Sequence, residues 1–251
     1  MRNIKIVIAY DGSDFAGWQV QNDQRTVQGV LQEALARMHG HPVRVQGAGR
    51  TDSGVHAIGQ VGNFKTDIDS IESHKFRDAI NSYLPFDIRI LASEVVPERF
   101  DSRRWAKARI YRYYIFPGDV GLPHLRKYCI KIRRFPDMRK LNAMASLLVG
   151  EKDFTTFAAK GDSNGSKIRR VFSSVFYTKD GFIVYQIAAN AFLWKMVRSI
   201  VGTILELEGA GGTPSDFRAI VEGRDRNLAG STAPARGLFL EKVIYGERDT
   251  F

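Results

Sequence analysis

The sequence has a single cysteine, Cys129, among 251 residues, and this scarcity excludes two classes of protein. An internal disulfide needs two cysteines, and zinc or iron–sulfur sites built from several cysteine ligands need more. The five histidines are scattered along the chain and form no ligand cluster. We therefore expect a fold stabilised by its core, without a structural metal.

The sequence also lacks an apolar segment long enough to cross a membrane. Its longest apolar run, residues 182–194, is interrupted by Gln186 and Asn190 and is shorter than the roughly 20 residues of a spanning helix. The N-terminus alternates polar and apolar side chains and lacks the continuous apolar stretch of an export signal. These patterns predict a cytoplasmic protein.

Charge is distributed unevenly along the chain. The net charge is +10, and residues 99–134 hold 11 basic and 2 acidic residues, a net charge of +9. A cluster of cations beside aromatic residues is typical of a surface that binds a polyanion, because neutralising phosphates releases counterions. A solvated basic face without a ligand is the alternative interpretation.

Hydrophobic patterning in the first half of the chain predicts a β-α-β-β-α-β order of elements. The expected elements are a strand at 3–10, a helix at 27–39 between Thr26 and Gly40, strand-like runs at 43–46 and 58–64, a helix at 73–83 and a strand at 87–96.

The second half repeats this order. The expected elements are a strand at 109–116, a helix from Asp137 to Gly150, a hairpin of 167–178 and 182–189 around Asp180-Gly181, a helix at 192–207, a short helix opened by Thr213-Pro214 and a strand at 238–245. The repeated order predicts an α+β fold of two ferredoxin-like (RRM-like) domains. We expect them at residues 1–100 and 101–251, with a cleft between their sheets.

The most unusual local sequence is the loop 47–57, Gly-Ala-Gly-Arg-Thr-Asp-Ser-Gly-Val-His-Ala. It lacks the third glycine of a dinucleotide-binding fingerprint. Its Asp52-Ser53-Gly54 matches aspartic proteases, but these need a second carboxylate, and Asp162-Ser163-Asn164 lacks the glycine. What remains is one aspartate with Arg50 two residues before it, or an ordinary Asx turn between two strands.

This loop resembles the Gly-Arg-Thr-Asp-x-Gly-Val-His-Ala signature of the tRNA pseudouridine synthase A family. The similarity extends along nearly the whole chain. Further motifs that resemble the family are Tyr10–Gln21, Thr26–Gln28, Ala108–Tyr113, Phe192–Gly202 and Ala233–Leu238. The stretch Ala158–Ser166 is less typical of it.

The resemblance implies a pseudouridine synthase fold with a central cleft, and an isomerase that converts uridine to pseudouridine in the anticodon stem-loop of tRNA. The family's target nucleotides there are tRNA positions 38, 39 and/or 40. It also implies tRNA as partner, a homodimer, and no cofactor or metal.

Three residues are expected to carry the chemistry, and a fourth, Arg50, to hold the substrate. By resemblance, Asp52 is the nucleophile, although attack on C1′ and abstraction of a sugar proton both stay open. A carboxylate buried alone loses its charge, so a cationic partner is required, and Arg198 on the shoulder of the 192–207 helix is the candidate. By resemblance, Tyr111 stacks on the target uracil and Arg50 helps to hold the flipped nucleotide.

Basic residues outside this set are expected to contact the RNA, mostly its phosphates, which fixes register without reading sequence. They are Arg103, Arg104, Lys107, Arg109, Arg126, Lys127 and Lys160. A non-catalytic RNA-binding module is the second hypothesis, but no aromatic RNP run is present.

The charge map generates a prediction about tRNA binding. Substituting Arg103, Arg104 and Lys107 should weaken binding to all tRNAs alike. It should also flatten the log–log salt dependence by nearly one unit for each phosphate that is no longer neutralised. Binding measured across a salt series checks this, and an unchanged slope would show that other residues neutralise the phosphates.

Overall fold

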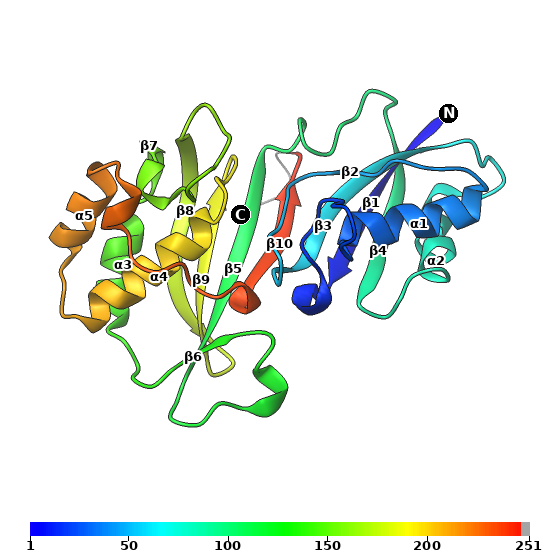
Figure 1. The fold of residues 1–251 in the computed structure, drawn as a ribbon. Helices are drawn as coiled ribbons and strands as arrows, with labels where there is room; N and C mark the ends of the chain where they lie inside the picture. Colours follow the sequence, from blue (N-terminus) through cyan, green and yellow to red (C-terminus); the bar gives the residue numbers. More distant parts are fainter. Residues whose placement is uncertain (247–251) are drawn as a thin grey trace. The chain divides into compact units, whose positions relative to one another are not determined.

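The computed structural model describes residues 1–246, which form ten strands and five α-helices (Figure 1). The strands are β1 (Arg2–Tyr10), β2 (Gln46–Gly47), β3 (His56–Thr66), β4 (Ile88–Val96), β5 (Ala108–Pro117), β6 (Ile130–Ile132), β7 (Gly150–Asp153), β8 (Ile168–Lys179), β9 (Phe182–Ala189) and β10 (Leu238–Ile244). The helices are α1 (Val27–His39), α2 (Phe76–Asn81), α3 (Met138–Ser146), α4 (Met196–Gly209) and α5 (Pro214–Glu222). This mixture of helices and largely antiparallel strands confirms the α+β class.

The chain divides into two units, and the division differs from the one expected from the sequence. The first unit is Met1–Lys107 together with residues 239–246, which hold all of β10 but its first residue, and the second is Ala108–Leu238. The sequence pattern placed the final strand in the second domain. In the structure β10 instead runs parallel to β3, with Phe239 opposite His56. A pairing between such distant segments has no local signal in the sequence.

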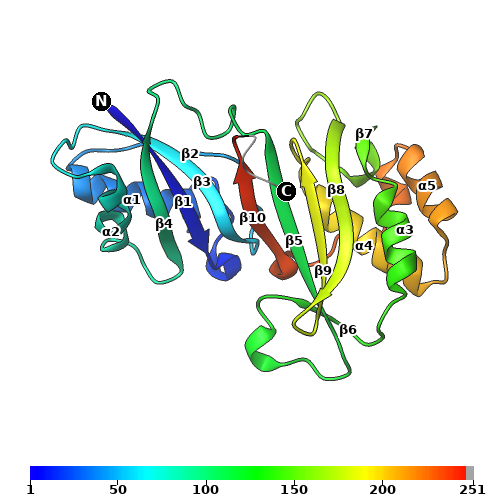
Figure 2. The same ribbon diagram turned by 180° about the vertical axis from the view of Figure 1, so that it is seen from behind.

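The sheet of the first unit has the order β4-β1-β3-β10, and β2 pairs with β3. β1 runs antiparallel to both neighbours, and its residues Ile4, Ile6 and Ile8 are fully buried. Helices α1 and α2 cover one face of this sheet, and Figure 2 shows its strands from the opposite side. As predicted, the Thr26 side chain caps α1 at the Gly29 N–H.

Two predicted elements of the first unit are shorter than expected. The run 43–46 contributes only Gln46 to a strand, because side chains of α1 bond the backbone of Val45 instead. Its N–H donates to Gln32 Oε1 at 3.1 Å, and its carbonyl accepts from Gln28 Nε2 at 2.9 Å. The helix predicted at 73–83 begins as a 3₁₀ turn, and α2 itself ends at Asn81.

The sheet of the second unit has the order β5-β9-β8-β7, and β6 pairs in parallel with β5. The predicted hairpin of β8 and β9 is confirmed, and Asp180 and Gly181 at its turn both have positive φ. Helices α3 and α4 lie on one face of β8 and β9 (Figures 1 and 2). Among the buried core side chains of this unit are Leu141, Met144, Phe154, Phe157, Phe176, Tyr185, Ile200 and Phe217.

The helices of the second unit differ from prediction at their ends. α4 begins at Met196 and not at Phe192, because Lys195 has φ +61° and a left-handed residue cannot continue an α-helix. α3 ends at Ser146, and Gly150, with φ +103°, begins β7 instead of closing the helix. The short strands β6 and β7 were not predicted.

Gly202 in α4 faces a neighbouring chain segment so closely that no side chain fits. A Cβ there would lie 1.8 Å from the Ser231 carbonyl oxygen, whereas one on Gly209 of the same helix would meet no atom within 4 Å. Gly202→Ala should therefore lower the free energy of unfolding by about 1–3 kcal/mol. The control Gly209→Ala should leave it unchanged or raise it by up to about 1 kcal/mol. Urea unfolding distinguishes the two, and equal stabilities would contradict the packing described.

Candidate functional site

Asp52 lies in the loop that connects β2 to β3, and backbone hydrogen bonds fix both sides of this loop. On the incoming side, the Ala48 N–H donates to the Val61 carbonyl at 2.8 Å. On the outgoing side, the Val55 N–H donates to the Asp52 carbonyl at 3.1 Å and closes a turn. Gly54 within this turn has φ +75°, a conformation that favours glycine. The Asp52 side chain is thus presented from an ordered turn.

The segment after β1 clamps the same loop. The Trp18 N–H donates to the Thr51 carbonyl at 3.1 Å. Two glycines permit this close approach. A Cβ atom on Gly17 would lie 2.8 Å from the carbonyl oxygen of Thr51, and a Cβ atom on Gly12 would lie 2.0 Å from the carbonyl oxygen of Val55. The glycines of the first motif are therefore required by backbone contact with the Asp52 loop.

The side chain of Thr51 points into the core between its two functional neighbours. Its hydroxyl lies 2.8 Å from the Tyr10 hydroxyl, and both residues are buried. Burial raises the pKa of Tyr10 above its usual range, so the phenol stays neutral and can donate. Arg50 is exposed and Asp52 is half-buried. Thr51 thus anchors the loop by an inward bond.

Arg198 lies in the first turn of α4, in the second unit. Its Nε donates to the Ala233 carbonyl at 2.8 Å, and the Ala233 N–H donates back to the Arg198 carbonyl at 3.0 Å. These reciprocal bonds hold the segment 231–234 along α4, and the missing side chain of Gly202 lets this segment approach the helix closely. The guanidinium is half-buried and oriented by a fixed acceptor.

Tyr111 lies on β5 of the same unit and is 7% exposed. Its ring meets that of Phe192 edge to face, with centroids 5.0 Å apart. Tyr113, two residues further, is a core residue whose hydroxyl donates to the Pro234 carbonyl at 2.7 Å. Burial raises the pKa of Tyr113, and the charge of Arg198 acts in the opposite direction.

The basic stretch 99–134 is shared between the two units. Arg103, Arg104 and Lys107 are exposed in the first unit. In the second unit Arg126 and Lys160 are exposed, Lys127 and Arg109 are half-buried, and Arg109 Nη1 donates to the Asn190 carbonyl at 2.7 Å.

Some cations of this stretch serve the fold. Arg134 pairs with the buried Glu208 at 2.5 Å, and Arg112 Nε donates to Gln186 Oε1 at 2.9 Å. Fewer cations of this stretch are therefore available to bind a polyanion than its net charge suggests.

Two further observations concern residues 1–246. Their His, Cys, Asp and Glu side chains form no group of three or more that could hold a metal ion. None of their helices has the length and apolar character needed to cross a membrane.

Comparison with known proteins identifies the family. A family model described as tRNA pseudouridine synthase matches residues 6–103 and 144–246. This chain belongs to that family. It is 47% identical to the tRNA pseudouridine synthase A of Treponema denticola, over 98% of this chain and 94% of the relative. The enzymes of the same name from Thermoanaerobacter and Borrelia duttonii are 42% and 40% identical, over 98% of this chain and all of each relative.

Only some of the candidate site residues lie within the ranges that match the tRNA pseudouridine synthase family model. They include Arg50, Asp52, Arg103, Lys160 and Arg198. Residues 104–143 lie outside them, and so do Tyr111 and most of the basic stretch. The roles of these residues stay predictions.

Sequence patterns missed the residues that support the site. Thr51 and Tyr10 lie within the motifs noted above, but their mutual bond joins residues 41 positions apart. Phe192 was expected in a helix, and its contact with Tyr111 follows from its place in the turn before α4. The alternation of Arg50, Thr51 and Asp52 was the one signal that could have identified Thr51 as the inward residue.

The Thr51 bond generates a stability prediction. Thr51→Val keeps the shape but removes the hydroxyl partner of the buried Tyr10, so it should lower the free energy of unfolding by about 1–2 kcal/mol. Thr51→Ser keeps the hydroxyl and serves as the matched control. Chemical denaturation measures both, and a Thr51→Val protein more stable than Thr51→Ser would contradict an anchoring role for this bond.

Proposed function

We propose that this chain isomerises uridine to pseudouridine in the anticodon arm of tRNA, with Asp52 as the catalytic carboxylate. The observation that carries the proposal is the Gly-Arg-Thr-Asp loop, held in an ordered turn by the backbone of residues 12–18. Membership of the tRNA pseudouridine synthase family supports both the reaction and the class of RNA.

The reaction is an isomerisation and balances without a co-reactant. The bond between C1′ and N1 breaks, the uracil turns, and a bond forms between C1′ and C5. The proton lost from C5 is balanced by one gained at N1. The Asp52 carboxylate acts as nucleophile toward the sugar and is released when the new bond is complete. Excluding water from the carboxylate is the main task left to the protein.

Arg198 and Tyr111 supply the other proposed contacts. The Arg198 guanidinium, which carries a permanent positive charge, is proposed to stabilise negative charge during the reaction. The fixed acceptor at Ala233 orients the Arg198 side chain for such a role. The Tyr111 ring, itself held by Phe192, offers a stacking surface for the target uracil.

Arg50 and the exposed cations complete the proposed interface with tRNA. Arg50 is exposed on the same loop as Asp52, where it can grip the flipped nucleotide or fill the space that the base leaves. The exposed cations Arg103, Arg104, Lys107, Arg126 and Lys160, with Lys127 and Arg109, contact the RNA. We further propose a homodimer that acts in the cytoplasm, without cofactor or metal.

Asp52→Asn tests the proposal directly. The variant should lower the single-turnover rate of pseudouridine formation by about four orders of magnitude, because an amide is neither a nucleophile nor a base. Its affinity for tRNA should be unchanged, since the contacts to phosphate are elsewhere. Asp23→Asn, an exposed position in the same unit, is the matched control for removal of one negative charge and should behave as wild type.

Two outcomes would contradict the proposal. Substantial turnover by Asp52→Asn would show that another group performs the chemistry. A wild-type chain that binds tRNA without forming pseudouridine would identify it as a binding module.

A further inference from the structure

The loop between the 3₁₀ turn at Thr155–Phe157 and β8 contains a buried carboxylate that the proposed mechanism does not use. The Asp162 side chain is 1% exposed, although its neighbours Gly161, Ser163 and Asn164 are exposed. A buried carboxylate on a surface loop is costly unless it is fully hydrogen-bonded. The hydrogen-bond partners of the Asp162 carboxylate therefore show which segments of the chain it fixes.

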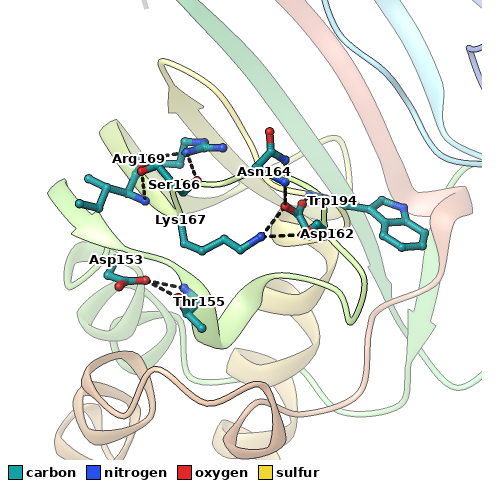
Figure 3. Close-up of polar contacts among 9 residues, drawn as sticks. Asp153, Thr155, Asp162, Asn164, Ser166, Lys167, Arg169 and Trp194 are labelled. Carbon is teal, nitrogen blue, oxygen red and sulfur yellow. Dashed lines mark hydrogen bonds and ion pairs between the residues drawn. The ribbon is translucent and has the colours of Figure 1, made fainter.

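The two oxygens of Asp162 have different partners (Figure 3). Oδ1 accepts from Lys167 Nζ at 2.7 Å and from the backbone and side-chain amides of Asn164, both at 2.9 Å. Oδ2 accepts from the backbone N–H of Trp194 at 2.6 Å. One oxygen thus ties the loop to itself, and the other ties it to the segment before α4.

The carboxylate stays ionised in this environment. Burial alone would raise the pKa of Asp162, but the bonds from Lys167, the Trp194 N–H and Asn164 hold it well below its usual range. Charged acceptors form the stronger hydrogen bonds in proteins. The hydrogen bond from the Trp194 N–H is therefore made to a charged acceptor.

The segment that Asp162 holds is the turn 192–195. The loop bonds both backbone groups of Trp194, because the Ala159 N–H donates to the Trp194 carbonyl at 3.0 Å. The next residue, Lys195, has φ +61° and caps α4 without a side-chain hydrogen bond. A left-handed conformation at a residue other than glycine persists only where the surroundings enforce it. Here the surroundings include the two bonds to Trp194.

This turn joins two groups of the proposed site. At its start, Phe192 contacts the ring of Tyr111. At its end, the Lys195 carbonyl accepts from the Ser199 N–H at 2.9 Å in the first turn of α4, which contains Arg198. A shift of the turn would displace the support of Tyr111 and the start of the helix together.

We propose that Asp162 is a positioning residue for pseudouridine formation: its carboxylate fixes the turn 192–195 and through it the placement of Tyr111 and Arg198. It takes no part in proton or bond transfer. This inference rests on the proposed roles of Tyr111 and Arg198.

The test compares Asp162→Ala and Asp162→Asn with a matched control in the full chain. Asp153 also accepts from a following residue, Thr155, at 2.9 Å (Figure 3), so Asp153→Asn controls for removal of a turn-capping carboxylate in the same region. For each protein we would measure the single-turnover rate on an anticodon-arm RNA, the affinity for that RNA, and amide hydrogen exchange in peptides covering 192–199.

Asp162→Ala should lower the rate by about 10- to 100-fold, because small displacements of positioned groups have effects of this size. Its affinity should change much less than its rate, because Lys160 of this loop is only one of several cations proposed to contact the RNA, and the amides of 194–199 should exchange faster. Asp162→Asn keeps an oxygen for the Trp194 N–H but loses the charge facing Lys167, so it should lie between Asp162→Ala and wild type. If Asp162→Ala does not fold, Asp162→Asn alone tests the proposal. Asp153→Asn should match wild type in rate and in exchange of 192–199.

Several results would overturn the inference. If exchange rises only in 159–167 and the rate is unchanged, Asp162 serves its own loop alone. If affinity falls as much as the rate, the loss is one of RNA binding, through Lys160 of the same loop, and not of positioning. Failure of the proposed function is recognised separately, because the wild-type chain would then form no pseudouridine while the exchange data still report whether Asp162 fixes the turn.

Discussion

The close backbone contact between residues 12–18 and the loop 51–55 is the constraint on which the proposed chemistry depends. Trp18 donates to the Thr51 carbonyl, and the glycines at 12 and 17 leave room that any Cβ would fill. The inward bond of Thr51 to Tyr10 adds a second attachment. Asp52 is thus positioned through the backbone of its loop.

In the second unit, α4 is likewise held by a close glycine contact and by backbone hydrogen bonds. α4 accommodates the segment 231–234 through Gly202 and the reciprocal bonds of Arg198 with Ala233. The turn before α4 is bonded on both sides of Trp194 by the loop around Asp162. In both units, glycines and backbone bonds place the candidate functional residue. A rigid backbone of this kind lowers the reorganisation needed when charge develops during the reaction.

Sequence patterns were sufficient wherever structure is decided locally. The alternation of Ile4, Ile6 and Ile8, the cap at Thr26 and the turn at Asp180-Gly181 each predicted their element correctly. The predictions of secondary structure and strand pairing failed where contacts between distant parts of the chain determine the structure. Val45 bonds glutamines of α1 instead of a strand, and β10 pairs with β3 across the length of the chain. Among the site residues, Asp52 is predicted from its motif as the catalytic carboxylate, and this role stays a prediction. The supports of the site could not be predicted, because they come from bonds between separate segments.

The central claim is that this member of the tRNA pseudouridine synthase family modifies uridine in the anticodon arm. The most direct measurement is to incubate the purified chain with unmodified tRNA transcripts and to map every pseudouridine by nucleotide. Our account predicts pseudouridine in the anticodon arm and nowhere else, formed without added metal or cofactor. Pseudouridine confined to another arm, or none in transcripts that the protein binds, would contradict it.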